Sequence, residues 1–438
     1  MKIRTLIIAL LFSIAAYGQY PGAYLEINST TGIYASGDTI KVWATVLPEA
    51  DKELEFVVEN NMITTTCKKL VNLNEGRHLM YTDICKGPVH YVFKIGKPEG
   101  KQGTPTTSVV GAIVDYKEFC PGYKAPKDLR KFWDREVEQM RSMPLEARVK
   151  PAPQERMDQT GMTCLDIEIP MPEGNPVRAY ISYPTEAREE SLPIIIYAHG
   201  AGVKGKWCKS SVDKTITDAR RGNGAIAIDI NAHGMLNGQP QEYYDDLEAG
   251  ELYKYSSREI TGHKDFYFRL MYLRLVRALD YLTTLPQWDG KRVLIYGSSQ
   301  GGAQTAALAG IDSRVTAAML EVPAFTDVAG RLCGRRGSWP GAYSSKAKEH
   351  SDILPYYDGS CLITLTKAKL FFEAGLVDYT CPPGCVSAAY NVATSEDKTI
   401  IFFPYRPHTT SKLDKRFAER WKNEVKVEKE KWLNDYLF

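Results

Sequence analysis

Residues 291–303 read KRVLIYGSSQGGA, and this stretch decides the fold of the chain. Val293 to Tyr296 form an apolar run without polar alternation, which is typical of a strand buried on both faces of a parallel sheet. The run breaks into Gly297-Ser298-Ser299-Gln300-Gly301, and an Ala-rich, helix-favouring segment follows. A strand, a Gly-x-Ser-x-Gly turn and a helix in this order make a nucleophile elbow. The stretch therefore predicts that the Ser299 hydroxyl is lifted above the edge of a buried sheet.

The two glycines of this turn have a steric reason. In so tight a turn, side chains two residues before and two residues after the serine would strike neighbouring backbone. The helix that follows aims its N-terminal N–H groups and its dipole at the same place as the hydroxyl. A free hydroxyl is a poor nucleophile, so this interpretation requires a histidine base and an acid later in the chain.

Buried strands and helices alternate on both sides of the elbow. Such alternation predicts an α/β fold with a mostly parallel sheet covered by helices. Residues 330–358 lack a clear period and carry several aromatic side chains, which is compatible with a lid. We expect strands at 164–169, 177–183, 194–198, 225–229, 317–321, 369–374 and 399–403, and helices from about 129 to 143, at 266–282 and at 414–437.

The first part of the chain has an all-β pattern. Residues 39–46 alternate in period two, and Gly, Pro, Asn and Asp separate further short runs at 54–58, 63–67, 91–95 and 108–114. We expect a small all-β sandwich of immunoglobulin type over residues 19–118, followed by an α/β domain over residues 119–438. The sandwich segment contains no set of nucleophile, base and acid. The sequence therefore favours a spacer or a wall over the active site, with carbohydrate binding as the alternative.

Residues 1–18 have the pattern of a secretory signal peptide. Lys2 and Arg4 precede an apolar centre, and Ala16-Tyr17-Gly18 supplies a small-x-small cleavage site. The apolar run is too short to span a bilayer, and no cysteine follows the cleavage site for a lipid. We therefore expect a periplasmic or secreted protein that does not insert into a membrane.

Composition restricts the partners and cofactors. The formal net charge of the 438 residues is +2, so no strong positive field is available for nucleic acid. The chain has nine cysteines, and none is grouped with histidine at zinc-like spacing, so we expect no metal and no other cofactor. In an exported protein, Cys67 with Cys85 and Cys381 with Cys385 are candidate disulfide pairs. The oligomeric state is left open.

The base and the acid follow the last two expected strands. Functional groups of an open parallel sheet collect where strands end at their carboxyl edge. Asp378 follows the strand at 369–374, and His408 follows the strand at 399–403. The order Ser299, Asp378, His408 is the α/β-hydrolase order, so we expect these residues to form a catalytic triad. Glu321, which also ends a strand, is the alternative acid.

An oxyanion formed at this serine needs two N–H donors. One is the backbone of the residue after the nucleophile, Gln300. The other comes from the loop after an earlier strand, where His199-Gly200-Ala201-Gly202 lies, and we expect the backbone N–H of Ala201 to serve. We interpret His199 as a structural hydrogen-bonding residue.

Four motifs of the second half of the chain belong together: Gly297-Ser298-Ser299-Gln300-Gly301-Gly302, Gly375-Leu376-Val377-Asp378-Tyr379-Thr380-Cys381-Pro382-Pro383, Ala388-Ala389-Tyr390-Asn391 and Pro404-Tyr405-Arg406-Pro407-His408. With these motifs the chain resembles the acetyl xylan esterase / cephalosporin C deacetylase family, from about Pro126 to the C-terminus. The resemblance implies the triad Ser299, Asp378 and His408, the oxyanion donors Gln300 and Ala201, and removal of small acyl groups, chiefly acetyl, from sugar hydroxyls. The Asp…Cys-Pro-Pro stretch favours Asp378 over Glu321.

The chain departs from that family at three places. The family's Arg-Gly-Gln after the fourth strand is here Asn231-Ala232-His233, its tyrosine after His-Gly is Ala201, and its Glu after the histidine is Thr409. The predicted function is a serine carbohydrate esterase whose substrate is acylated plant polysaccharide or its oligosaccharides. The alternatives are a serine peptidase, another carboxylic ester hydrolase of this fold, and a glycan-binding protein with a decayed site.

Overall fold

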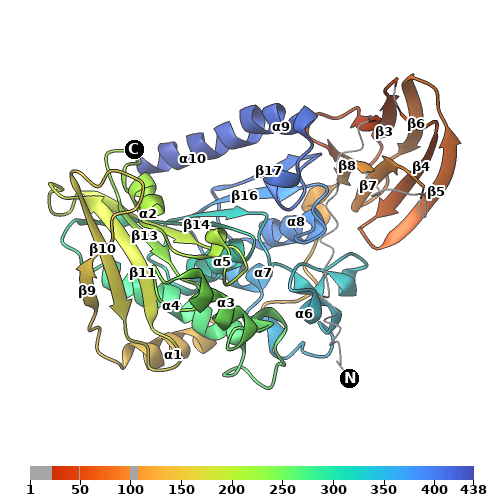
Figure 1. The fold of residues 1–438 in the computed structure, drawn as a ribbon. Coiled ribbons are helices and arrows are strands. Elements are labelled where there is room, and N and C mark those ends of the chain that lie inside the picture. The colour runs from red at the N-terminus through yellow and green to blue at the C-terminus, as the bar shows by residue number, and fades with distance from the viewer. Residues whose placement is uncertain (1–21, 49, 99–106) are drawn as a thin grey trace, which may run out of the picture.

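A nine-stranded mixed sheet forms the centre of the computed structural model, which describes residues 22–48, 50–98 and 107–438 (Figure 1). Six neighbouring strands pair in parallel, and three further strands extend one end of the sheet by antiparallel pairing. In sheet order the strands are β17 (Lys398–Phe403), β16 (Lys369–Gly375), β15 (Ala317–Glu321), β14 (Trp288–Ser298), β12 (Leu192–Ala198), β13 (Ile226–Ile230), β11 (Val177–Pro184), β10 (Met162–Ile169) and β9 (Arg148–Pro151).

Helices cover both faces of this sheet, as the uninterrupted apolar runs of the parallel strands require. On one face, the helices share the main hydrophobic core with the sheet. On the other face, α10 packs Trp432 against Phe371 of β16, and α2 packs against Tyr180 of β11. The helices on the first face are α1 (Leu129–Arg141), α4 (Tyr267–Leu282), α5 (Gln300–Ile311), α7 (Gly359–Leu362) and α8 (Pro383–Val392). Those on the second face are α2 (Val212–Ala219) and α10 (Val427–Leu437). The remaining α-helices are α3 (Gln241–Ala249), α6 (Gly341–Ser345) and α9 (Lys415–Trp421).

Two smaller sheets, called here the N-terminal sheets, precede the central sheet and share a second core. The period-two patterns place their apolar residues inward, as the alternating burial of β3 illustrates. One sheet has the order β1 (Ala23–Ile27), β3 (Thr39–Val46), β6 (Gly76–Ile84); the other has the order β2 (Ile33–Tyr34), β8 (Thr107–Val114), β7 (Val89–Gly96), β4 (Glu53–Asn60), β5 (Thr64–Asn72).

The N-terminal sheets are joined to the C-terminal part of the chain through this second core. Phe403, Tyr405, Leu413 and Val425 pack among the residues of the two sheets. In Figure 1, α9 and α10 run along the central sheet toward the N-terminal sheets, and a π-helical turn at Lys422–Lys426 lies between them. The helix expected at 414–437 is therefore present with one irregular turn.

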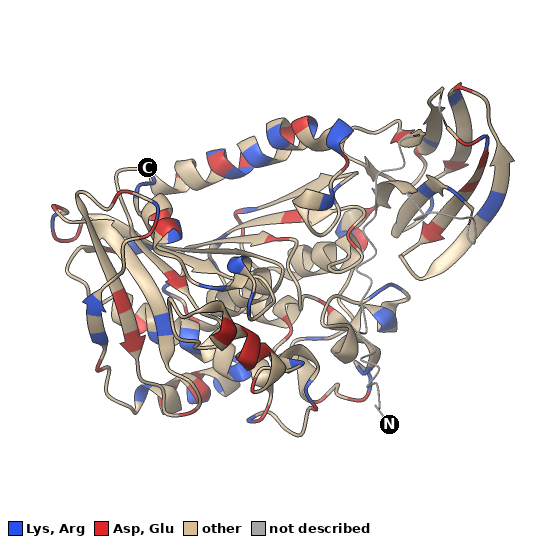
Figure 2. Ribbon diagram, in the orientation of Figure 1, with Lys and Arg blue, Asp and Glu red and all other residues tan. Residues whose placement is uncertain are grey.

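Charged residues of both signs are interspersed over the ribbon, including along α9 and α10 (Figure 2). This mixture of signs agrees with the net charge of +2, although α3 carries acidic residues and no basic ones. Within the described ranges, no helix combines the length and the apolar character that crossing a membrane needs. The signal peptide predicted at residues 1–18 lies outside the described residues.

Two expectations are corrected by the structure. The segment expected as a lid is packed into the core, because Tyr343, Leu354 and Tyr357 are buried there. All nine cysteines are free thiols, so neither candidate disulfide forms. Cys381 lies two residues before α8, whereas Cys385 lies in its first turn and directs its Sγ to the carbonyl of Arg336 at 3.2 Å. Cys67 lies on β5, whereas Cys85 directly follows β6 of the other N-terminal sheet.

Candidate active site

The nucleophile elbow forms as the sequence predicts. Ser299 lies between the end of β14 and the start of α5 with φ 58° and ψ −120°, a strained conformation for a residue with a side chain. A Cβ added to Gly297 would lie 2.6 Å from the carbonyl oxygen of Ala198, and one added to Gly301 would lie 2.1 Å from the same atom. Both positions therefore require glycine, and the turn holds the serine hydroxyl at the carboxyl edge of the sheet.

The structure brings Ser299, His408 and Asp378 together in one chain of hydrogen bonds. Nε2 of His408 lies 2.9 Å from Oγ of Ser299, and Nδ1 of His408 lies 2.8 Å from Oδ2 of Asp378. Asp378 is fully buried, and its other oxygen, Oδ1, accepts the backbone N–H groups of Thr380 at 2.8 Å and Cys381 at 2.9 Å. The carboxylate is therefore fixed from both sides, with one oxygen aimed at the imidazole.

Glu321, the alternative acid, is engaged elsewhere. Its carboxylate pairs with Nζ of Lys429 at 2.6 Å, while its backbone carbonyl accepts the N–H of Ser299 at 3.0 Å. Its side chain therefore takes no part in the hydrogen-bond chain that runs through His408.

The two expected oxyanion donors flank the serine. Gln300 is the first residue of α5, where a backbone N–H has no acceptor within the helix. Among the described residues, the N–H of Ala201 donates to no acceptor, whereas the N–H of the next residue, Gly202, donates to the hydroxyl of Tyr255 at 3.1 Å. Of these neighbouring amides, the N–H of Ala201 is thus the one left open to a ligand.

Tyr255 connects the two segments that carry the expected oxyanion donors. Its buried hydroxyl accepts from Gly202 and donates to Oε1 of Gln300 at 2.7 Å. Burial lowers the pKa of His233 to about 3, so its ring is neutral. Nε2–H of His233 donates to the carbonyl of Gly202 at 3.0 Å, and Nδ1 accepts from the hydroxyl of Tyr267 at 2.7 Å. The histidine at the family's Arg-Gly-Gln position therefore supports the loop that contains Ala201 and Gly202.

His199 has the structural role that the sequence suggested. Its Nδ1–H donates to the carbonyl of Trp207 at 2.9 Å, and its Nε2 faces the buried carboxylate of Asp229. Burial alone would lower the pKa of His199, but Asp229 outweighs it and raises the pKa. The imidazole is directed into this pair and the loop that precedes α2, and not toward Ser299.

A buried ion cluster lies beneath the base loop. Glu373 on β16 pairs with Nε of Arg406 at 2.9 Å and with Nζ of Lys429 at 2.7 Å. Burial alone would raise the pKa of Glu373, but Lys429 and Arg406 hold it at about 2. Nη1 of Arg406 also donates to the backbone carbonyl of His408 at 2.7 Å. The cluster thus fixes the backbone on which the imidazole is carried.

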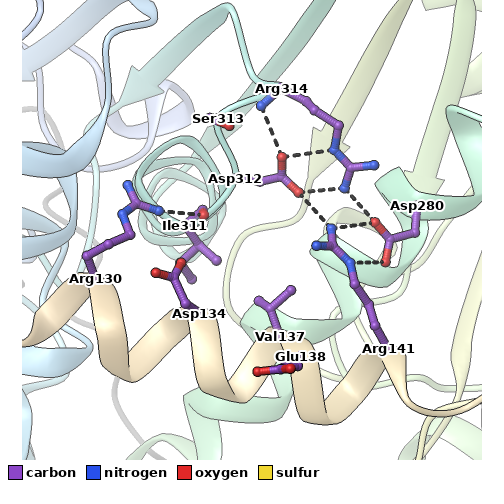
Figure 3. A pocket seen from close by; sticks show the side chains of 10 residues that line it. All are labelled: Arg130, Asp134, Val137, Glu138, Arg141, Asp280, Ile311, Asp312, Ser313 and Arg314. Atoms are coloured by element: carbon purple, nitrogen blue, oxygen red, sulfur yellow. Dashed lines mark hydrogen bonds and ion pairs between the residues drawn. The ribbon is translucent and has the colours of Figure 1, made fainter.

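An open groove of about 610 Å³ gives access to Ser299 and His408. Trp207 is 66% exposed at this groove, and Trp339 and Trp421 also line it. Another cavity, of about 730 Å³, lies where α5 ends, at the opposite edge of the sheet from the elbow (Figure 3). Four of its charged side chains neutralise one another, because Asp280 and Asp312 pair with Arg141 and Arg314 at 2.5 to 3.5 Å. The groove at Ser299 is therefore the candidate active site.

Asp378, Cys381 and His408 offer atoms within 4.8 Å of one another that could in principle hold a metal ion. The two ring nitrogens of His408 already face Asp378 and Ser299. Burial raises the pKa of the Cys381 thiol well above its usual value, which favours the protonated form over a thiolate ligand. The hydrogen bonds of the triad account for the proximity of these groups.

The sheet, the elbow and its neighbours define an α/β-hydrolase. A model of the acetyl xylan esterase (AXE1) family matches residues 112–332 and 342–425, so the chain belongs to this family and is a carboxylic ester hydrolase. The acetyl esterase Axe7A of Xylanibacter ruminicola is 26% identical over 398 residues, which cover 88% of this chain and 86% of that protein.

Two solved structures have the same fold. The acetyl xylan esterase from Paenibacillus sp. R4 aligns with a TM-score of 0.56 and 22% identity, over 74% of this chain and 98% of that chain. Acetyl xylan esterase 1 from Thermoanaerobacterium sp. JW/SL YS485 aligns with a TM-score of 0.52 and 21% identity, over 70% of this chain and 96% of that chain. At these identities the likeness concerns the fold, and it agrees with the α/β prediction.

Sequence reasoning did not identify several residues that support the site. Glu373 breaks an otherwise apolar strand, and this buried charge is a signal that could have pointed to the ion cluster. Tyr255 and Lys429 lie in segments without a motif, and their contacts join residues far apart in the chain. Their roles become visible only from the structure.

Proposed function

We propose that the protein is a serine carbohydrate esterase that removes acetyl groups from sugar hydroxyls through an acyl-enzyme. The observation that carries the proposal is the continuous hydrogen-bond chain from Asp378 through His408 to Ser299. Membership of the acetyl xylan esterase family supports the ester substrate.

In the proposed reaction, Oγ of Ser299 attacks the acyl carbon while Nε2 of His408 accepts its proton. The backbone N–H groups of Gln300 and Ala201 stabilise the oxyanion of the tetrahedral intermediate. His408 then donates the proton to the sugar oxygen as the bond between that oxygen and the acyl carbon breaks, so the sugar leaves with a free hydroxyl and the acetyl group stays on Ser299. Water activated by the same imidazole releases acetate, and Asp378 holds the ring in the required tautomer throughout.

The form of the groove supports a carbohydrate substrate, and we propose acetylated plant polysaccharide or its oligosaccharides. The groove is open, which suits a polymer that must present an ester along its length. Exposed Trp207 offers a flat apolar face next to the serine, a surface on which a sugar ring can stack. The names of the relatives, acetyl esterase and acetyl xylan esterase, support the same substrate class.

We also propose the organisation and the location predicted from the sequence. A signal peptide at residues 1–18 would deliver the protein to the periplasm or the medium. The two N-terminal sheets with their common core support an immunoglobulin-type sandwich at residues 19–118, with the catalytic domain at residues 119–438. Peptide mapping of the secreted protein by mass spectrometry tests the cleavage site, since a mature protein that begins at Gln19 is expected.

Acetate release is the test of the proposed function. The parent is compared on acetylated xylan, acetylated pectin, acetylated monosaccharides and an aminoacyl anilide. Ser299→Ala and His408→Ala should each lower kcat by about 10⁴ or more, and the double variant should lose little further because the residues act as a unit. Additive losses would contradict the triad. Faster cleavage of the anilide than of any ester would favour a peptidase, and sugar binding without hydrolysis by the parent would favour a glycan-binding protein.

A further inference from the structure

The loops that carry Asp378 and His408 lie directly against the N-terminal sheets. The acid loop follows β16 and the base loop follows β17, the strand at the edge of the central sheet. Lys94 and Val109, on β7 and β8, line a cavity of about 150 Å³ together with His408 and Thr380. The N-terminal sheets therefore border the loops that carry the acid and the base.

His90, on β7, makes a buried hydrogen bond to the acid loop. Its Nε2–H donates to the backbone carbonyl of Leu376 at 2.8 Å, two residues before Asp378 and 286 residues away in sequence. The side chain is buried, and burial lowers the pKa of His90 to about 4, so the ring is neutral near pH 7 and can act as this donor. The backbone N–H of His90 donates to Oδ1 of Asn61 at 3.0 Å. His90 is thus held at its backbone by Asn61 and at its side chain by the loop that carries Asp378.

The base loop is held by the neighbouring strand. The N–H of Gly111 on β8 donates to the carbonyl of Pro404 at 2.8 Å, at the start of the loop that leads to His408. A Cβ on Gly111 would lie 2.1 Å from the carbonyl oxygen of Leu376, so a side chain there would push the acid loop away. Only glycine allows β8 to contact both loops at this distance.

The residue after Asp378 is held as well. The hydroxyl of Tyr379 donates to Oε2 of Glu59 at 2.5 Å, and Nζ of Lys94 lies 4.8 Å from the centre of the Tyr379 ring. Val377, on the other side of Asp378, packs with Val92 and Met62 of the N-terminal sheets. Contacts from the N-terminal sheets therefore bracket the acid on both sides.

We propose that the N-terminal sheets are a working part of the catalytic machinery, with His90 as a positioning residue that holds the Asp378 loop in register with His408. This goes beyond a spacer or a wall, and it rests on the proposed triad. Displacement of a catalytic group by about 1 Å can cost on the order of 10² in rate, so a buried bond two residues from the acid affects kcat more than substrate binding.

The test compares kcat and KM of His90→Ala, His90→Gln and His78→Ala on a soluble acetyl ester. His78, on β6, is the control for loss of a histidine from the same sheets: its Nε2 also lies 2.8 Å from a backbone carbonyl, that of Asn74, but this hydrogen bond is exposed and touches neither loop. We expect His90→Ala to lower kcat about tenfold to a hundredfold with KM within about threefold. His90→Gln, whose amide N–H can reach the same carbonyl, should recover most of the rate, and His78→Ala should match the parent.

A folded His90→Ala variant with the kcat of the parent would overturn the proposal, as would an equal loss in His78→Ala. If His90→Ala does not fold, kcat and KM are measured for Tyr379→Phe instead, because this substitution removes only the hydroxyl that donates to Glu59. For this variant, a lowered kcat at unchanged KM supports the proposal, and a kcat equal to that of the parent overturns it.

Ser299→Ala is measured in parallel to separate the proposed triad from the proposed role of His90. Full activity of Ser299→Ala contradicts the triad. An inactive Ser299→Ala beside an unaffected His90→Ala contradicts only the positioning role of His90.

Discussion

Replacing Asp378 by asparagine tests the triad at its most constrained residue. Oδ1 of Asp378 accepts two backbone N–H groups, and Oδ2 faces Nδ1 of His408 at 2.8 Å. An amide turned the other way would place its NH₂ against the two N–H donors, leaving buried groups unsatisfied at a cost of about 1–3 kcal/mol each. The side-chain amide of the Asp378→Asn variant must therefore keep its oxygen at the Oδ1 position and present NH₂ to the imidazole.

This orientation selects the wrong tautomer of the base. Nδ1 of His408 has to accept from the amide, so the ring proton moves to Nε2, the atom that lies 2.9 Å from Oγ of Ser299. An Nε2–H cannot accept the serine proton. We expect kcat to fall by about 10⁴, which corresponds to roughly 5 kcal/mol of barrier, while KM changes little.

The assay is steady-state hydrolysis of a chromogenic acetyl ester, with thermal unfolding as a check on the fold. Asp289→Asn is the matched control, because Oδ1 of Asp289 also accepts two backbone N–H groups, from Lys291 at 2.9 Å and Arg292 at 2.8 Å, before the buried part of β14 and far from the elbow. The reasoning is refuted if folded Asp378→Asn keeps kcat within about tenfold of the parent, or if Asp289→Asn loses as much.

Two further predictions concern the residues around the triad. Tyr255→Phe removes the hydroxyl shared by Gly202 and Gln300, so the oxyanion loop loosens; we expect kcat to fall about tenfold at unchanged KM, and an unchanged kcat would count against this role. The second prediction is a pH effect, because burial lowers the pKa of His90 to about 4 from an ordinary value of 6.5. Below about pH 6.5 the His90 ring is protonated in the unfolded chain but not in the folded chain, so the free energy of unfolding falls as pH falls toward 4. Between neutral pH and about pH 4 the parent should lose on the order of 3 kcal/mol of unfolding free energy more than His90→Gln, measured by urea denaturation; equal losses would contradict the neutral buried ring.

The central parts of the site could be predicted because their causes are local. The elbow follows from steric contacts of Gly297 and Gly301 with the adjacent strand, which a short stretch of sequence encodes. The positions of Asp378 and His408 follow from the rule that parallel strands end at one edge of a sheet. Strand order was not needed for that inference, and the resulting three residues do lie within hydrogen-bond distance.

The supporting residues could not be predicted because their partners are distant in sequence. The bond from His90 to Leu376 spans 286 residues, and nothing in the pattern of β7 distinguishes this histidine from a core residue. The strand β6 was not expected either, since apolar and polar residues do not alternate along it and five of its nine residues, Leu79 and Ile84 among them, are exposed. The expected disulfides were wrong because the spacing of two cysteines in the sequence does not show where their thiols point. The thiol of Cys385, for example, donates to the carbonyl of Arg336 at 3.2 Å.

Direct observation of the acyl-enzyme tests the central claim, that Ser299 carries the acyl group. The parent is mixed with excess acetyl ester, quenched in acid during turnover, digested and mapped by mass spectrometry. If Ser299 is the nucleophile, one acetyl group is expected on the peptide that contains Ser299, and none on the same peptide from Ser299→Ala. Rapid turnover with no acetyl on that peptide at any quench time, or acetyl on a different residue that disappears at the turnover rate, would contradict it.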